Sequence, residues 1–441
     1  MADERPITRG AIFAQAWPII LGQALVPLVS VVDVAVIGRL SDGRNLGGVA
    51  LGTTILNLVF WSFGFLRMGV TGITAQAKGA REDGEVCATI LRSLVLGLGL
   101  GAMLLAVSPV IVPVGLHLMA APAGVEGAAR DFLTMRFWGA PAALGFYAIN
   151  GWLLGLGRTR LALGVQAVMN GVNIGLDLLF VGALGMGARG VGLGTTLAEW
   201  SALAGGIVAI ALVLGPDWRG QLRAIGRARL FDMTALRRLI VVNADIMVRT
   251  LALLAIFTWF TRSAAALGPV PLAANHVLMQ TVSISAFVLD GFAFTAEARV
   301  GAAIGARSRA TLLRAIRLTG EFSLAGGLLF SLAILALGGD AIAFLTHDAA
   351  IRALAHAMLP YCAAVPLVGV ASWLLDGIFI GAIAGATLRN AAVVALGLYL
   401  LTDFALKPLG DAGIWLALLA SYAYRALALG VAVPALLRRS L

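Results

Sequence analysis

The chain has 441 residues, of which 60% are hydrophobic and 12% are charged, and its mean hydropathy is +0.95. A soluble protein of this length needs more polar surface to cover its core, so the composition excludes a soluble globular fold. The net charge of +10 does not indicate nucleic-acid binding, because the basic residues are scattered singly between apolar runs. The sequence therefore predicts an all-α integral membrane protein.

Twelve apolar segments, each long enough to cross about 30 Å of hydrocarbon, follow one another along the chain. They lie at roughly 16–38, 47–75, 87–113, 131–156, 161–183, 190–214, 238–267, 271–303, 311–337, 353–383, 388–408 and 411–437. The first carries Pro18, Pro27 and Asp33 and lacks a small-residue cleavage site. We therefore expect it to be retained as a helix and not removed as a signal peptide.

The basic residues indicate the orientation in the membrane. With the N-terminus in the cytoplasm, the cytoplasmic segments between these spans hold 15 Lys and Arg residues, the external loops hold five, and twelve lie inside the span bounds. Because positive residues are enriched in cytoplasmic loops, this ratio near three to one predicts that both termini are cytoplasmic.

The two halves of the chain form a tandem repeat with an offset of 226 residues. At this offset Leu46 falls on Leu272, Gly79-Ala80-Arg81 on Gly305-Ala306-Arg307, Gly151 and Gly155 on Gly377 and Gly381, and Asp177 on Asp403. Six helices per half give both halves the same orientation, so the repeat is parallel, an architecture typical of transporters. We predict an N-lobe at 1–215 with helices 1–6, a cytoplasmic linker at 216–237, and a C-lobe at 238–441 with helices 7–12.

Acidic residues inside the spans are the strongest functional signal, since a charge at the centre of a membrane helix costs at least ~2.5 kcal/mol. Asp33 in the first span and Asp177 in the fifth lie at similar depth, given a rise of about 1.5 Å per residue. Gln166, Asn170 and Asn173 share one face of the fifth span with Asp177. Two neighbouring acids with amide groups suit reversible protonation or sodium binding. The alternative is a hydrogen-bonded pair that only holds the first and fifth helices together.

Long motifs are spread over nearly the whole chain. They are VPLVSVVDVAVIGRL, FLRMGVTGITAQAKGA, GWLLGLGRTR and NGVNIGLDLLFVGALGMGARGVGLGTTLAEW in the first half, and NADIMVR, VLDGFAFTAEARVGAAIGAR and LLDGIFIGAIAGATLRN in the second. These motifs resemble the multidrug and toxic compound extrusion (MATE) family, most closely its DinF branch. The resemblance implies a cation-coupled efflux protein of the bacterial inner membrane, with two pseudo-symmetric six-helix lobes arranged in a V.

The resemblance also implies which residues form the site. In the DinF branch, an aspartate of helix 1, an asparagine and an aspartate of helix 5 and a threonine of helix 6 belong to the cation-coupling network. The matching positions here are Asp33, Asn173, Asp177 and Thr195. Further N-lobe cavity residues are expected at Gln166, Asn170, Asn150 and Met135, the last replacing a tyrosine of some characterised members. If the coupling ion is sodium, we expect it at Asp33 and Asp177.

A second group of charges lies in the C-lobe. Asp245 and Arg249 are four residues apart on the seventh span, in the order that favours an ion pair, and Glu297 and Arg299 lie near the inner end of the eighth. We expect a neutralised cluster that stabilises the inner end of this lobe. The alternative is a second cation or substrate site, since other MATE branches place acids on the corresponding helices.

Four further intramembrane acids are interpreted separately. We expect Asp290, Asp376 and Glu199 to be structural. Asp403 repeats Asp177, but the position that repeats Asp33 holds Trp259, so only the N-lobe has the complete acid pair.

The predicted function is that of a cation-coupled antiporter that exports lipophilic, often cationic, organic compounds. The chain lacks a GxxxxGK[ST] motif for ATP, a nucleophile–base set and metal-ligand spacing, so we expect no cofactor, no catalytic residues and no enzyme activity. The coupling ion is a proton or sodium. The alternative function is a lipid or oligosaccharide flippase of the same superfamily, whose cavity should be basic to meet phosphate. Small organic substrates and the lipid bilayer are the expected partners, nucleic acid is not, and we expect a monomer.

Overall fold

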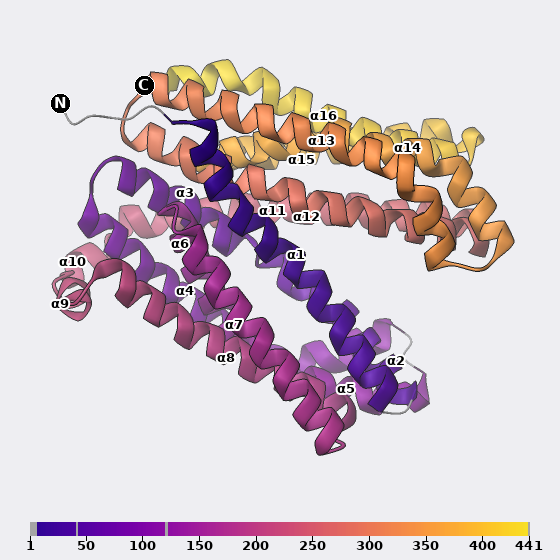
Figure 1. The fold of residues 1–441 in the computed structure, drawn as a ribbon. Helices are drawn as coiled ribbons and strands as arrows, with labels where there is room; N and C mark the ends of the chain where they lie inside the picture. Colours follow the sequence, from indigo (N-terminus) through magenta and orange to yellow (C-terminus); the bar gives the residue numbers. More distant parts are fainter. Residues whose placement is uncertain (1–6, 41–42, 120–121, 440–441) are drawn as a thin grey trace. The chain divides into compact units, whose positions relative to one another are not determined.

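The computed structural model describes residues 7–40, 43–119 and 122–439, without the side chains of residues 26–35, 38–40, 123, 227 and 439. All regular structure in these residues is helical, which confirms the predicted all-α class (Figure 1). The helices are α1 (Arg9–Leu40), α2 (Gly43–Ser62), α3 (Phe65–Gly79), α4 (Asp83–Leu118), α5 (Ala123–Phe137), α6 (Ala140–Gly155), α7 (Thr159–Asp177), η1 (Leu178–Ala183), α8 (Gly187–Leu214), α9 (Trp218–Arg223), α10 (Arg227–Leu230), α11 (Met233–Leu267), α12 (Pro269–Gly305), α13 (Arg309–Leu345), α14 (Ala349–Gly381), α15 (Gly385–Leu406), η2 (Lys407–Leu409) and α16 (Asp411–Arg439).

Ten helical segments among the described residues are long and apolar enough to cross a membrane. They correspond to ten of the twelve predicted spans. The predicted first span lies in α1, part of whose side chains are outside the described residues. The predicted fourth span is divided between α5 and α6, which have 15 and 16 residues, so neither alone is long enough to span.

The predicted repeat is present in the backbone. Helix starts recur at the offset of 226, with Gly43 and Pro269, Asp83 and Arg309, Ala123 and Ala349, and Thr159 and Gly385 as the equivalent pairs. Left-handed backbone conformations recur as well, at Arg81 and Arg307 (φ 60° and 51°) and at Gly157 and Ile383 (φ 69° and 57°). Two halves of different sequence therefore follow the same path through their loops.

Glycines that recur in the repeat allow equivalent helices to approach closely. A Cβ atom added at Gly151 or Gly155 would overlap the carbonyl oxygen of Arg67 or Thr71, and one added at Gly377 or Gly381 would overlap that of Ala293 or Glu297. These carbonyls are themselves 226 residues apart. Small residues at such crossings are the usual means of close packing in membrane helices.

The first half departs from regular helix at three places where the second half is more regular. The chain breaks between α2 and α3 at Phe63–Gly64 and between α5 and α6 at Trp138–Gly139, whereas the equivalent α12 and α14 are each continuous. Directly after Asp177, η1 is a π-helix, in which the amide of Leu184 donates to the carbonyl of Leu179 at 3.0 Å. The equivalent α15 continues as an α-helix to Leu406. π-Helical turns inside α-helices are frequent at functional sites.

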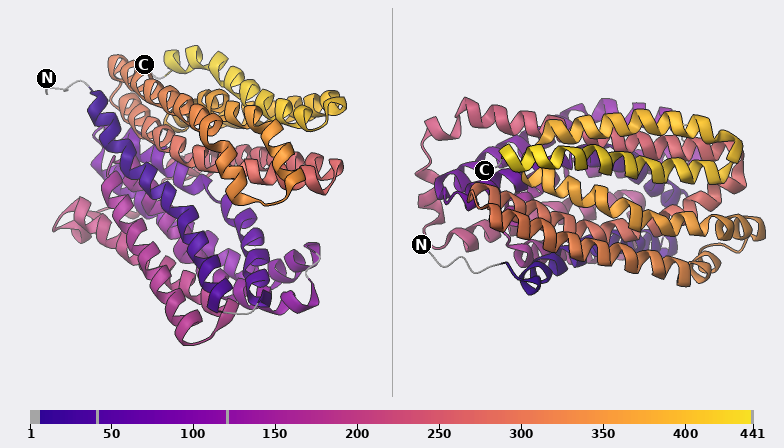
Figure 2. Two further views of the ribbon diagram at one scale, coloured as in Figure 1. Left: turned by 45° about the vertical axis from the view of Figure 1, so that its right-hand side comes forward. Right: turned by 90° about the horizontal axis from the view of Figure 1, so that it is seen from above.

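Contacts divide the chain into two compact units. One comprises residues 1–20, 79–81 and 241–441, and the other residues 21–78 and 82–240. Helices α11 to α16 of the first unit are visible from two further directions in Figure 2. The first residues of α1 pack within the first unit, where Ala16 contacts a cluster containing Leu289, Phe292 and Val370. The predicted lobe boundaries and the V-shaped arrangement stay predictions.

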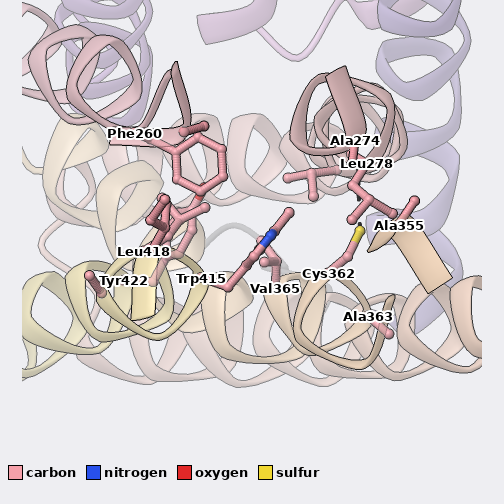
Figure 3. Packing of buried hydrophobic residues seen from close by; sticks show 14 of the residues in the cluster. Phe260, Ala274, Leu278, Ala355, Cys362, Ala363, Val365, Trp415, Leu418 and Tyr422 are labelled. Atoms are coloured by element: carbon pink, nitrogen blue, oxygen red, sulfur yellow. Dashed lines mark hydrogen bonds between the residues drawn. The ribbon is translucent and has the colours of Figure 1, made fainter. Parts of the chain in front are cut away.

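Each unit has its own apolar core. In the unit of α11 to α16, Phe260 and Trp415 pack edge to face with ring centroids 5.3 Å apart, and Cys362 lies in the same cluster (Figure 3). In the other unit, Trp152 is fully buried and donates from Nε1 to the carbonyl of Val86 at 3.0 Å. A buried indole N–H needs such a partner, which fixes the rotation of α6 against α4.

Candidate functional site

Helix α7 carries the polar stripe expected for the fifth span. Asp177 is 0% exposed, Asn173 2% and Asn170 6%. Gln166 donates from Nε2 to Oδ1 of Asn170 at 3.1 Å, one turn further along the same face. An amide pair and a carboxylate buried on one face require polar partners from neighbouring helices.

Helix α8 supplies such a partner. Asn173 donates from Nδ2 to Oδ2 of Asp177 at 3.4 Å and to Oγ1 of Thr195 at 3.2 Å. Thr195 in turn donates to the carbonyl of Val191 at 2.9 Å, so its oxygen accepts from Asn173. The structure thus brings together three of the four residues predicted for the coupling site.

The carboxylate of Asp177 lies directly against the backbone of α8. A Cβ atom at Gly194 would overlap Oδ1 of Asp177, so a larger residue there would force this carboxylate to move. Oδ1 of Asn173 is buried and has no hydrogen-bond partner among the described residues. Carboxylate, amide and hydroxyl oxygens are the hard donors that suit a proton or an alkali cation. The described residues contain no group of three or more His, Cys, Asp or Glu that would hold another metal.

Asp33 lies on α1, but its side chain is outside the described residues. In the second half of the repeat, Trp259 occupies the position equivalent to Asp33. There, Trp259 donates from Nε1 to Oδ2 of Asp403 at 2.9 Å, and Ser263 donates to the same oxygen at 2.9 Å. Trp259 and Asp403 are the equivalents of Asp33 and Asp177, so this pair of positions is in direct contact in the second half.

Two other predicted N-lobe residues lie in the two helices of the interrupted fourth span. Met135 is half-buried at the end of α5, and its carbonyl accepts from Oγ1 of Thr196 at 2.8 Å. Asn150 is half-buried on α6. The sequence did not indicate that the fourth span is interrupted between them, although Pro141 was a signal for it.

The predicted C-lobe charges find partners on other helices. Arg389 of α15 donates to Oδ1 of Asp245 at 2.6 Å, and Arg249 forms an ion pair with Asp376 of α14. Arg425 of α16 also approaches Oδ2 of Asp376, at 3.5 Å. Sequence spacing had suggested a pair between Asp245 and Arg249 because they are one turn apart. Helix packing instead supplies partners more than 100 residues away.

The remaining members of the predicted cluster lie on α12. Glu297 is 0% exposed, and Arg299 donates to the carbonyl of Ala11 at 3.5 Å. Sequence reasoning missed Arg425, which is 4% exposed and also donates to Oγ of Ser372 at 2.8 Å. A lone arginine within an apolar span was the available signal, since a buried guanidinium requires a counter-ion.

A repeated, all-helical architecture, with ten helices able to cross a membrane among the described residues and charges buried between them, defines a multi-pass membrane protein. The MatE family model matches residues 18–179 and 246–405, once in each half of the repeat. The chain belongs to this family, the MATE transporters, whose members are transporters and not enzymes.

Individual members of the family are similar to this chain over most of its length. It is 38% identical over 421 residues to DNA damage-inducible protein F of Escherichia coli K12, covering 95% of this chain and 90% of that protein. It is 28% identical over 377 residues to a probable multidrug resistance protein NorM of Aromatoleum aromaticum, covering 80% and 76%. The crystal structure of the Vibrio cholerae MATE transporter VcmN in its bent form shares the fold, with a TM-score of 0.86, 17% identity, and coverage of 98% and 97%. The predicted membership of the MATE family and its DinF branch is thereby confirmed.

Proposed function

We propose that this chain is a cation-coupled antiporter that exports lipophilic, often cationic, organic compounds across the bacterial inner membrane, with both termini in the cytoplasm. A proton or a sodium ion is the coupling ion, and Asp33, Asn173, Asp177 and Thr195 form its site. The names of the NorM relatives, probable multidrug resistance proteins, support the substrate class.

The observation that carries the proposal is the contrast between equivalent acids. Asp403 receives two hydrogen bonds from neutral groups, Trp259 and Ser263, so the protein itself satisfies this buried carboxyl oxygen. At the position of that tryptophan the first half has a second acid, Asp33, which the repeat would place beside Asp177. Two adjacent carboxylates cannot both stay charged in a membrane without a cation or a proton between them. The first half therefore has the properties of an exchangeable site and the second half those of a fixed one.

The arginines of the second half support the same division. Asp376 has two guanidinium groups within ion-pair distance, from Arg249 and Arg425. Neutralising this carboxylate would leave two buried positive charges facing one another, which is costly. Asp376 thus serves as a permanent counter-ion, and the coupling step belongs to the first half.

We propose the following sequence of events. Loss of the cation from Asp33 and Asp177 opens the site to substrate, and cation binding from outside neutralises the acids and favours release of substrate outward. Asn173 supports both states, because its amide donates to the charged carboxylate while its own oxygen is available to a bound cation or a protonated acid.

Two substitutions at equivalent positions test the proposal. Purified protein is reconstituted in liposomes, and dye transport is driven in turn by a proton gradient and by a sodium gradient. Asp177→Asn should abolish transport driven by either gradient while leaving the protein folded. Asp403→Asn is the matched control, because asparagine can still accept from Trp259 and Ser263, and it should transport at the wild-type rate.

Gradient-driven transport by Asp177→Asn at the wild-type rate would refute the assigned site. Gradient-independent movement of a fluorescent lipid, without dye transport, would instead favour the flippase alternative. These outcomes are distinguishable because dye and lipid are measured in the same vesicles.

A further inference from the structure

The fourth span is interrupted in the middle of the first half. Helix α5 ends at Phe137 and α6 begins at Ala140, with Pro141 in its first turn. Proline has no N–H, so the carbonyl of Phe137 loses its normal helical donor, which weakens the helix at this point. We call Trp138 and Gly139, the two residues between α5 and α6, the α5/α6 joint.

Helix α8 supplies hydrogen bonds to the carbonyls exposed by this joint. Thr196 donates from Oγ1 to the carbonyl of Met135 at 2.8 Å, and Trp200 donates from Nε1 to the carbonyl of Trp138 at 3.2 Å. Both donors lie on the same side of α8, one turn apart. The joint is therefore held open in a defined geometry by a neighbouring helix.

An ion pair lies between these two hydrogen bonds. Arg136, the last residue but one of α5, contacts Oε2 of Glu199 at 2.9 Å, and both side chains are only 12% exposed. The same carboxylate oxygen lies against Gly139, where an added Cβ would overlap it. A carboxylate at the start of α6 is also favoured by the helix dipole. Glu199 thus contacts both sides of the joint, through its ion pair with Arg136 on one side and by close packing against Gly139 on the other.

The same segment of α8 contacts the candidate coupling site. Thr195, which accepts a hydrogen bond from Asn173, lies one turn before Glu199 and next to Thr196. Helix α8 is a continuous helix of 28 residues. A shift of Thr195 therefore moves Glu199 with it, since an unbroken helix turn is stiff.

The second half contains no equivalent arrangement at the repeat positions. Helix α14 is continuous, the equivalent of Arg136 is Cys362, and the equivalent of Glu199 is Arg425. Cys362 lies in the apolar core beside Leu278, to whose carbonyl its thiol donates at 3.6 Å (Figure 3). The repeated fold consequently does not require the ion pair, and its presence in the first half needs a separate explanation.

We infer that Glu199 and Arg136 are positioning residues that transmit the state of Asp177 to the α5/α6 joint. This inference rests on the proposed function of the Asp177 site. When the cation leaves, the hydrogen bonds among Asp177, Asn173 and Thr195 rearrange, and α8 carries this movement to the ion pair. The joint then bends, so that the first half changes shape at a place where its backbone is already interrupted.

The chain offers a matched control on the same helix. Glu126 and Arg130 of α5 form an ion pair at 2.7 Å, with side chains 44% and 48% exposed. Exposed ion pairs of this kind contribute little to folding stability, whereas loss of one partner of a buried pair leaves an uncompensated charge. Glu126→Gln should therefore leave transport, cation binding and the joint unchanged.

The test measures the joint directly. Spin labels at Gly127 and Arg158, exposed positions on either side of the joint, report its angle in reconstituted protein with and without the coupling cation. In a wild-type background we expect the distance to shift when the cation is added. With Glu199→Gln we expect a broader distribution of the label-to-label distance that no longer responds to the cation. We also expect the rate at which cation is exchanged for substrate to fall roughly tenfold. Cation binding itself, measured by proton release or sodium titration, should be retained. The exchange of both charges, Glu199→Arg with Arg136→Glu, should recover the response.

A narrow distribution that still shifts with the cation in Glu199→Gln would overturn the inference. So would loss of cation binding in that variant, because the pair would then belong to the site itself. Failure of the proposed function has a different signature, in which wild-type protein neither binds the cation nor transports against its gradient. The breadth of the distance distribution in Glu199→Gln tests the role of the Arg136–Glu199 ion pair even then, since it is measured without any cation, and a wild-type breadth would refute that role.

Discussion

The charge cluster around Asp376 provides a quantitative test of the division between the two halves. We consider the substitution Arg249→Met, which removes one guanidinium and keeps a side chain of similar length. Asp376 and Arg249 are 4% and 8% exposed, so neither group is solvated by water in the folded protein. Removing the arginine leaves the carboxylate with Arg425, whose nearest nitrogen is 3.5 Å from Oδ2.

Breaking a buried ion pair by deleting one partner costs about 3–5 kcal/mol. Because Arg425 remains within reach and also bonds to Ser372, we expect a value near the lower end, about 3 kcal/mol. Asp376→Leu alone should cost at least as much, because it leaves two guanidinium groups unpaired by this carboxylate. The double substitution Arg249→Met with Asp376→Leu should recover a large part of the loss, since apolar groups of similar volume replace the pair.

The free energy of unfolding is measured by denaturant titration in mixed micelles, together with the cation dependence of transport at temperatures where each variant is folded. Arg130→Gln, which disrupts an exposed ion pair on α5, should change stability by less than about 1 kcal/mol. All folded C-lobe variants should keep the cation dependence of the wild-type protein. Wild-type stability in Arg249→Met, or an altered coupling ion in that variant, would refute the structural interpretation and favour a second cation site.

Three further predictions follow from the repeat and the topology. Gly155→Val should destabilise the protein by about 1–3 kcal/mol, measured by the same titration, because even its Cβ would lie 2.6 Å from a backbone carbonyl oxygen; unchanged stability would show that this crossing is loose. Trp259→Phe should cost about 1–3 kcal/mol by removing a donor from buried Asp403 while leaving cation-driven transport intact, and loss of coupling in a folded variant would contradict the assignment of that acid as fixed. On intact cells, a cysteine replacing Arg223 should be protected from an impermeant thiol reagent, whereas a cysteine replacing Gly124 should react with it. The opposite labelling would reverse the predicted orientation.

The sequence alone was sufficient for the fold class and the repeat, because both depend on local properties. Apolar length determines which segments can span a membrane, and the glycines at Gly151 and Gly377 recur where helices must approach. The proximity of Asn173, Asp177 and Thr195 could also be predicted. Buried polar groups are rare enough in apolar helices to be conspicuous, and the family resemblance indicated Thr195.

Tertiary structure alone decided which charges pair. Asp245 and Arg249 are one turn apart, yet each has a partner on a different helix, because long side chains in a bundle contact whatever the packing of neighbouring helices brings near. The break at Trp138–Gly139 and its contact with Glu199 likewise depend on where α8 lies against α5. Sequence spacing describes neighbours within one helix, whereas the energetics of a buried charge are set by groups more than 60 residues away in the chain, as with Arg136 and Glu199.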